Sequence, residues 1–343
     1  MFRDTQWISD SKVKNKKNKA KRRHTDPPSS DTSSTTSSDK ASQLSNSDEI
    51  LTINSFYDPL PPSDPKVLRN IEGGEYFLPS ADKNIERLQM QHYLFSKCVW
   101  RSNYSSPLEE NFELGGAKVL DVQCGSGIWM SDLATEYSNS TFVGIDDDAE
   151  RARIEMELPN AAFLHHNLME GLPFPDDTFD FVHQRFFTSV NEADWENYIL
   201  PEIVRILKPG GWVELMEMQP LSNAGHTTKK IFKAYDEFNL KIGIHQLNPC
   251  VFQKALTSNK MINSSTVHSD HRITPLFGGR LSQLVCQNLF KRLELKKKEF
   301  CGFMNMNESE FNGTINTMYD EVNKLKTYCK TYRDNIGNDG IYY

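Results

Sequence analysis

Short apolar runs alternate with longer helical or loop stretches between Lys118 and Met218. The runs read KVLDV, TFVGID, AAFLHH, FDFVH and GWVELMEM. Apolar strands separated by helical stretches favour a parallel sheet covered by helices, because each crossover places a helix on a face of the sheet. No repeat of roughly 20 to 50 residues is present, which disfavours solenoids and propellers. The pattern therefore predicts an α/β fold with a doubly wound, mostly parallel sheet.

The first fifty residues differ in composition from the rest of the chain. Residues 12–23 hold eight basic residues and no acidic one, and twelve of the twenty residues in 28–47 are Ser or Thr. Such segments bury too little apolar surface to offset the entropy of an ordered chain. We predict a disordered tail at 1–50, a Pro-rich linker at 51–69 and a folded domain at 70–343. The basic run is either a nuclear import signal or a solvated tail.

Charge and cysteine usage limit the classes of partner and the compartment. The formal net charge is -7, and the basic excess is confined to the tail, which leaves an acidic body. An acidic body is a poor partner for nucleic acid, whose phosphates require basic residues. No apolar run is long enough to span a bilayer, and the N-terminus lacks the apolar core of a signal peptide. The six scattered cysteines indicate reduced thiols. We expect a cytoplasmic or nuclear protein without a membrane partner.

The stretch KVLDVQCGSGIWM, residues 118–130, reads as a strand, a glycine turn and the start of a helix. Such a turn offers backbone N–H groups and a helix N-terminus to a polar ligand. Gln123 stands where close approach of a ligand favours glycine. A left-handed backbone there costs about 1–2 kcal/mol for a side chain other than glycine; otherwise the side chain lines the site. We predict that Gln123→Gly tightens ligand binding, whereas unchanged or weaker affinity would show that Gln123 belongs to the site.

Polar residues follow the next three predicted strands at the same edge of the sheet. Asp146 ends the second strand about twenty residues after the glycine turn, where an acid accepts hydrogen bonds from both hydroxyls of a ribose. The turn at Asn167 and Leu168 would lie over a neighbouring pocket for a planar base. The fourth strand ends in three polar residues, His183, Gln184 and Arg185. In doubly wound sheets, ligands bind at this carboxyl edge.

These motifs resemble a known family. VLDVQCGSGIW, FVGIDDD, NLMEGLPFPDDTFDFV and EIVRILKPGGWVELMEM are similar to the successive motifs of class I S-adenosylmethionine-dependent methyltransferases. The segment YFLPSADKNIERLQMQHYLFSK, together with FVHQRF, is similar to the fungal branch that includes regulatory methyltransferases of secondary metabolism. The resemblance covers residues 75–218, and more weakly 274–284. It implies a seven-stranded, Rossmann-like sheet and S-adenosyl-L-methionine as the cofactor.

The resemblance also implies roles for matching positions. It places Asp121, Gln123, Gly125 and Gly127 beside the methionine part of the cofactor, Asp146 and Asp147 at the ribose, Asn167 and Leu168 at the adenine, and Gln184 or its neighbour at the amino acid end. A helix carrying Arg87, Gln91 and His92 would cover the pocket. The folded domain then divides into a lid helix region at 70–115, a cofactor-binding core at 116–218 and a substrate-side, C-terminal helical region at 219–343.

Methyl transfer from a sulfonium needs little acid or base chemistry. The donor is already activated, so the protein mainly holds donor and nucleophile in line and excludes water. A base is required only when the acceptor starts protonated. His92, His183 and Glu217 are weak candidates by position, and a structural role is the alternative for each. The histidine-containing segments at 165–166 and 268–271 lack further ligands at metal-site spacing, so we expect no metal.

Three functions fit these observations to different degrees. The first is an active methyltransferase whose acceptor, a small molecule or a protein, the sequence does not identify. The alternative is a catalytically silent methyltransferase fold that acts as a regulator or scaffold, motivated by Gln123 and by the atypical ending TYRDNIGNDGIYY. A nicotinamide-dependent dehydrogenase shares the early motifs, but Met130 stands where the third glycine of its fingerprint belongs.

The C-terminal region carries one long apolar stripe. Residues spaced by three or four positions are Phe311, Ile315, Met318, Val322, Leu325, Cys329 and Tyr332. This spacing predicts an amphipathic helix over 308–333. Its apolar face packs on its own domain or, alternatively, binds a protein partner, although Met, Cys and Tyr are poor choices for a coiled-coil seam.

Overall fold

The computed structural model describes residues 83–147, 158–258 and 267–337. The predicted tail and linker, and the part of the lid region before Lys83, lie outside these residues. Seven strands form one sheet in the order β3-β2-β1-β4-β5-β7-β6. Their bounds are β1 Lys118–Val122, β2 Thr141–Asp146, β3 Ala161–His165, β4 Phe179–Arg185, β5 Leu207–Met218, β6 Val267–Pro275 and β7 Tyr328–Gly337. β7 runs antiparallel to both of its neighbours, β5 and β6, and the other neighbouring strands pair in parallel. The predicted seven-stranded, mostly parallel sheet is confirmed.

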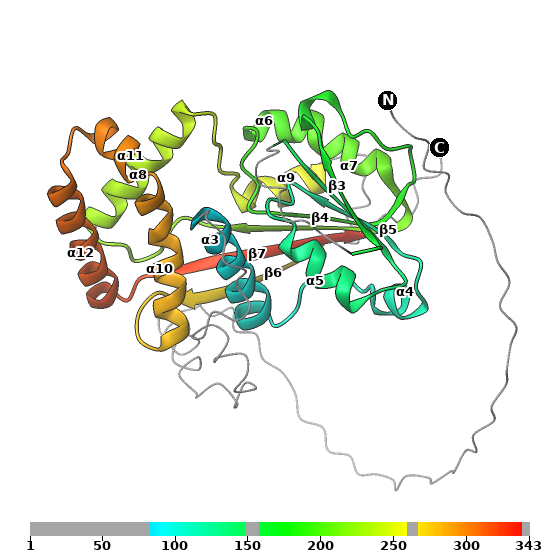
Figure 1. The fold of residues 1–343 in the computed structure, drawn as a ribbon, viewed down its shortest axis with the longest axis horizontal. Helices are drawn as coiled ribbons and strands as arrows, with labels where there is room; N and C mark the ends of the chain where they lie inside the picture. The colour runs from blue at the N-terminus through cyan, green and yellow to red at the C-terminus, as the bar shows by residue number, and fades with distance from the viewer. Residues whose placement is uncertain (1–82, 148–157, 259–266, 338–343) are drawn as a thin grey trace, which may run out of the picture. The chain divides into compact units, whose positions relative to one another are not determined.

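Helices cover both faces of the sheet (Figure 1). One face packs against α4 (Glu109–Leu114) and α5 (Ile128–Glu136), with Trp129 and Phe181 among the buried residues of that layer. The other face packs against η3 (Trp195–Ile199) and α7 (Leu200–Ile206), with α6 (Glu192–Asp194) and η2 (Leu168–Glu170) at its margin and α9 (Pro249–Ser258) alongside. This arrangement leaves the carboxyl ends of the parallel strands uncovered by the two layers.

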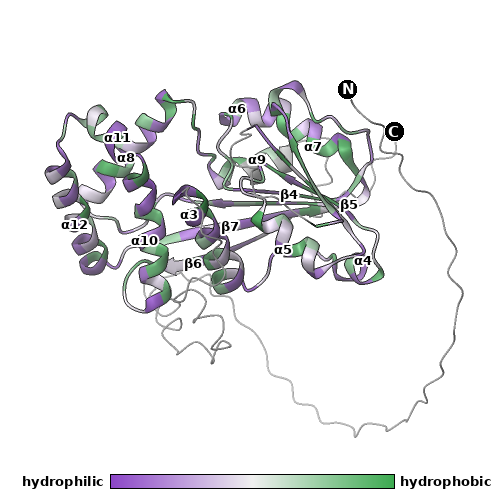
Figure 2. Cartoon of the chain, viewed as in Figure 1, coloured by the Kyte–Doolittle hydropathy of each residue, from purple (hydrophilic) through white to green (hydrophobic). Residues whose placement is uncertain are grey.

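A group of helices lies beyond those carboxyl ends (Figure 1). It consists of α8 (His226–Lys241), α10 (Arg280–Leu295), α11 (Lys297–Met304) and α12 (Glu308–Leu325), joined by α3 (Lys83–His92) and the π-helix η1 (Tyr93–Trp100). We call this group the helical cover. Its helices bury a shared apolar core and show hydrophilic residues on their outer sides (Figure 2). No described helix is both long and apolar enough to cross a membrane.

The predicted helix over 308–333 is wrong at its C-terminal end. The helix begins with a capping box between Asn307 and Glu310 and ends at Leu325, because Lys326 adopts a left-handed conformation with φ of 59°. Cys329 and Tyr332 belong instead to β7, although their spacing continues the helical stripe. From Phe311 to Val322 the stripe is buried in the core of the helical cover, whereas Leu325 is 44% exposed. Its apolar face therefore packs on its own domain.

The last strand is complete over the described residues. β7 pairs with β5 from Met218 opposite Thr331 to Trp212 opposite Gly337. Arg333, which is 1% exposed, donates to the Ser102 carbonyl at 2.8 Å, and its Nε lies 3.6 Å from Glu214 Oε1. Burying this pair ties β7 to β5 and to the segment before α4. The atypical ending of the sequence therefore does not leave the sheet unfinished.

Candidate functional site

The turn between β1 and α5 forms the centre of the site. Gly125 has a φ of 57°, and Gly127, with a φ of 69°, caps the N-terminus of α5. The Gly125 N–H donates to Asp146 Oδ2 at 2.8 Å, which fixes the turn to the end of β2. A Cβ added at Gly125 would meet no atom within 4 Å. The glycine turn thus presents backbone to open space at the carboxyl edge of the sheet.

Gln123 adopts the left-handed conformation, with a φ of 55°, which was one of the two alternatives that the sequence left open. Its side chain is also engaged, because Oε1 accepts from the Thr188 N–H at 2.7 Å and Nε2 donates to the Ser189 hydroxyl. A longer bond of 3.4 Å joins Nε2 to Thr188 Oγ1. We call these contacts the glutamine clamp. The clamp joins the glycine turn to the segment after β4, which favours the alternative in which Gln123 belongs to the site.

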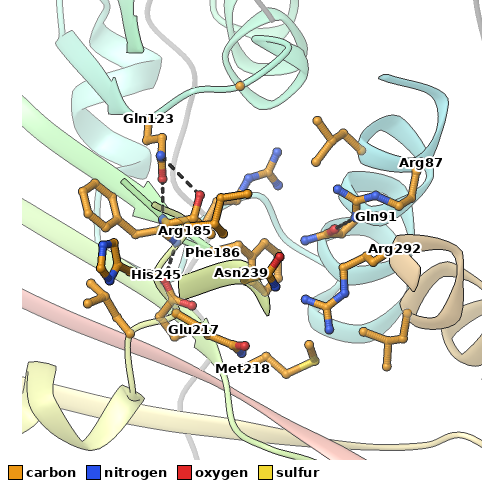
Figure 3. A pocket seen from close by; sticks show the side chains of 18 of the residues that line it. Arg87, Gln91, Gln123, Arg185, Phe186, Glu217, Met218, Asn239, His245 and Arg292 are labelled. Atoms are coloured by element: carbon orange, nitrogen blue, oxygen red, sulfur yellow. Dashed lines mark hydrogen bonds between the residues drawn. The ribbon is translucent and has the colours of Figure 1, made fainter. Parts of the chain in front are cut away.

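A cavity of about 650 Å³ opens beside the glycine turn (Figure 3). Its walls come from the turn, from α3, from the ends of β4 and β5, and from α8 and α10 of the helical cover. The volume is in the usual range for a small-molecule site. Ser126 lines this cavity, and its buried hydroxyl has no hydrogen-bond partner among the described residues. The turn therefore faces a cavity with a polar group left for a ligand.

His92 and Arg185 form a hydrogen-bonded pair in the cavity wall. The Arg185 Nη1 donates to His92 Nδ1 at 2.9 Å, so that nitrogen acts as an acceptor and the ring is neutral. Burial lowers the pKa of His92 to about 4, against the opposing hydrogen bond from Asp132, whose Oδ2 lies 3.5 Å from Nε2. Burial lowers the pKa of Arg185 to about 10, which keeps its guanidinium charged near neutral pH. The pair thus presents one positive charge held by a neutral imidazole.

Glu217 lies at the end of β5 and also lines the cavity. Its side chain is 2% exposed, and Oε1 accepts from the Phe187 N–H at 2.5 Å. Burial raises the pKa of Glu217 well above its ordinary value, even though backbone N–H groups of Phe187 and Met218 favour the charged form. Burial therefore favours the neutral form of this carboxyl, against those two N–H groups.

The structure places the other predicted residues away from this cavity. His183 is fully buried, donates through Nδ1 to Asp121 Oδ1 at 2.9 Å, and stacks on Trp129 with centroids 3.7 Å apart. Gln184 points to the opposite face of the sheet, where Oε1 accepts from Trp195 Nε1 at 3.1 Å. These contacts give His183 and Gln184 structural partners, whereas Arg185, the neighbour of Gln184, reaches the cavity.

The residues predicted at the ribose and adenine lie at the neighbouring edge. Asp146 is fully buried against the glycine turn, and Asp147 beside it is exposed. Asn167 is exposed and caps η2 by accepting from the Met169 N–H at 3.1 Å, while Leu168 is buried in the sheet core. Residues 148–157, which follow Asp147, lie outside the described residues. The cavity beside Gln123 therefore contains only part of the predicted site.

Sequence reasoning missed the part of the cavity wall supplied by α8 and α10. These helices contribute Tyr235 and Asn239 from α8, and Leu289 and Arg292 from α10. Arg292 lies on the turn between Leu289 and Leu293, two positions of the buried stripe of α10. A charged residue next to such a stripe is the signal that was available, but it does not reveal which pocket the helix faces.

Comparison with known proteins agrees with this geometry. Residues 119–211 match the family model described as a methyltransferase domain. Methyltransferase str3 of Strobilurus tenacellus is 31% identical over 140 residues, which is 40% of this chain and 47% of that protein. N-methyltransferase verN of Clonostachys rogersoniana is 30% identical over 145 residues, covering 41% and 50%. The demethylmenaquinone methyltransferase of Lysinibacillus sphaericus is 34% identical over 132 residues, covering 37% and 54%.

The chain thus spans about half the length of the curated relatives it matches. The matched residues contain β1, the glycine turn and the strands up to the start of β5, which is the part that the sequence motifs identified. Together with the strand order, they show that this chain has a class I methyltransferase fold and that residues 119–211 form a methyltransferase domain with fungal relatives. The predicted family is confirmed.

Substitutions at Gln123 separate two contributions to the free energy of unfolding: the cost of its left-handed backbone and the stabilisation by the glutamine clamp. Gln123→Ala keeps the left-handed conformation and loses neutral hydrogen bonds of about 0.5–1.5 kcal/mol each, so it should lower the free energy of unfolding by about 1–3 kcal/mol. Gln123→Gly loses the same bonds but relieves the backbone, so it should be about 1 kcal/mol more stable than Gln123→Ala. Urea denaturation measures both. Equal stability of the two variants would contradict the left-handed backbone, and an alanine variant as stable as wild type would contradict the clamp.

The buried His92 predicts a loss of stability in mild acid. Its pKa is 6.5 in the unfolded chain and about 4 in the folded one. Between these values the unfolded chain binds a proton that the folded chain does not, so the free energy of unfolding falls as the pH drops, by on the order of 3 kcal/mol. His92→Gln keeps an acceptor for Arg185 and removes the titration. Urea denaturation at about pH 7 and about pH 4.5 should show a smaller loss for the variant; an identical loss would contradict a neutral, buried His92.

Proposed function

We propose that this domain transfers a methyl group from S-adenosyl-L-methionine to a small acceptor bound in the cavity. The observation that carries the proposal is the glycine turn, which faces a cavity with open space at Gly125 and an unpaired buried hydroxyl at Ser126. A helix N-terminus and free backbone groups at this place suit the polar, methionine end of the cofactor. The family match supports the same donor.

Some of the predicted cofactor-binding residues line the cavity, and others support the glycine turn. We propose that Gly125, Ser126 and the clamped Gln123 hold its methionine end, because they line the cavity. Asp121 and Gly127 then support the turn indirectly. Asp121 does so through its buried contact with His183, and Gly127 as the cap of α5. In this proposal the fully buried Asp146 sets the position of the turn by accepting from Gly125.

The ribose and adenine then lie toward β2 and β3. Asp147 and Asn167 are exposed at that edge and are accessible to a ligand, and Leu168 contributes an apolar surface from below. Gln184 is engaged with Trp195 on the other face of the sheet, so we propose that Arg185 takes the place beside the amino acid end.

Positioning is the main contribution that this chain makes to the reaction. The bound cofactor supplies an activated methyl group on a sulfonium, which is transferred by in-line displacement. The helical cover and α3 close the cavity, which excludes water and orients the acceptor. His92 Nδ1 is occupied by Arg185, and Glu217 Oε1 is occupied by the Phe187 N–H, so these two acceptor atoms are already engaged in this arrangement. The proposal therefore fits an acceptor atom that carries an available lone pair.

A catalytically silent scaffold is less well supported. Its motivations were the side chain at position 123 and an incomplete last strand. The side chain of Gln123 holds the site together through Thr188, and β7 forms its full set of pairs with β5. Both features leave the cavity intact.

Two alanine substitutions at glycine test whether the turn binds the cofactor. Gly125 and Gly116 flank the two ends of β1, both have positive φ, and a Cβ at either meets no atom within 4 Å. Each alanine should cost about 1 kcal/mol of stability through backbone strain. Isothermal calorimetry of the full chain with S-adenosylhomocysteine should show binding for wild type and for Gly116→Ala, and at least roughly tenfold weaker binding for Gly125→Ala, whose methyl enters the ligand space. Absence of binding to the wild-type chain would contradict the proposed function.

A further inference from the structure

Three arginines extend into the same cavity from different elements. Arg87 comes from α3, Arg185 from the end of β4 and Arg292 from α10 (Figure 3). The two helices are neighbours, because Asn288 Nδ2 of α10 donates to the Arg87 carbonyl at 2.8 Å. Packing α3 on α10 therefore brings two guanidinium groups to one wall, with the third at the floor.

Arg185 and Arg87 both donate to neutral side chains. Arg185 donates to the neutral imidazole of His92, and Arg87 donates to the side-chain oxygens of Asn84 at 3.1 Å and Gln91 at 2.6 Å. The side chain of Arg292 makes no hydrogen bond or ion pair with a described residue, and its Nε is buried. A buried donor without a partner is costly, so its presence in a cavity wall points to an acceptor brought by a ligand.

Two acidic residues, Glu217 and Asp236, line the cavity beside the basic ones. Burial favours the neutral form of Glu217, because it raises the pKa of that carboxyl well above its ordinary value. Asp236, on α8, is exposed and forms no ion pair with Arg292, although the charge of that guanidinium favours its ionised form. The lining carries four basic side chains, Arg87, Arg185, Arg292 and Lys296, against these two acidic ones. The lining of the cavity therefore has an excess of positive charge.

We infer that the methyl acceptor is a small molecule with a carboxylate or phosphate group, which Arg292 binds together with Arg87. A guanidinium matches the paired oxygens of such groups through two parallel hydrogen bonds. Gln123 and Arg292 lie on opposite sides of the cavity (Figure 3), so the anionic group anchors one end of the molecule and the methylated atom lies near the glycine turn. This inference rests on the proposed function and specifies its substrate class.

The residues between the two ends describe the body of the acceptor. The apolar residues Phe186, Met218 and Leu289 line the cavity together with the arginines and the glycine turn. An apolar middle with an anionic anchor fits an aromatic or aliphatic acid better than a sugar phosphate, which needs polar partners along its length. The cavity thus selects both a charge and an apolar body.

Binding of matched probes to the full chain saturated with S-adenosylhomocysteine tests the inference. The probes are benzoate against benzamide, and phenyl phosphate against phenol. We expect at least one anion to bind about tenfold or more tightly than its neutral counterpart, as measured by calorimetry. Whichever pair shows the difference identifies carboxylate or phosphate as the anchor. A result in which neither anion binds more tightly than its neutral counterpart overturns the inference.

Two variants of α10 provide the matched control. Arg292→Met removes a guanidinium that no described residue needs as a partner, and it should remove the preference for the anion while leaving affinity for S-adenosylhomocysteine unchanged. Lys291→Met removes an exposed charge from the same helix, outside the cavity, and should keep the preference. An anion preference that survives Arg292→Met, or that Lys291→Met also removes, overturns the inference. Loss of S-adenosylhomocysteine binding by the wild-type chain would instead count against the proposed function, so the two failures are distinguishable.

Discussion

The glycine turn after β1 is held from two sides, and the site depends on this constraint. On one side the Asp146 carboxylate accepts from the Gly125 N–H, and on the other the Gln123 amide binds the Thr188 backbone. The turn lies between β2 and β4, the two neighbours of β1, where the strand order reverses. Ligands of doubly wound sheets bind at such a point, because neighbouring crossovers leave on opposite faces and open a crevice. The two contacts set the width of that crevice.

A glutamine at the first position of the turn therefore costs backbone strain and contributes side-chain hydrogen bonds that glycine cannot make. Glycine would avoid the left-handed strain but would leave the segment after β4 without its side-chain anchor. Thr188 and Phe187 of that segment line the cavity, and the Phe187 N–H also binds Glu217. The clamp thus connects the ends of β1, β4 and β5 through backbone groups, which makes the shape of the cavity a property of the sheet edge.

Much of the cofactor-binding half could be predicted because it depends on local patterns. The bounds of β1 and β2 agree with the apolar runs, and the glycine turn follows directly from its residues. The direction of a side chain depends on alternation along a strand, which places Gln184 against Trp195 and Arg185 in the cavity. The helical stripe continued past Leu325 by coincidence of spacing, and only the left-handed Lys326 marks the change to a strand. Arg292 reaches the site through tertiary packing, which no local pattern encodes.

Hydrogen–deuterium exchange of the full chain, with and without S-adenosylhomocysteine, tests most directly whether the clamped turn holds the cofactor. The account predicts slower exchange in two segments that are distant in sequence, residues 123–128 of the turn and residues 186–189 after β4, because ligand binding would stabilise both ends of the glutamine clamp. Binding of S-adenosylhomocysteine that leaves exchange in both segments unchanged would contradict the account.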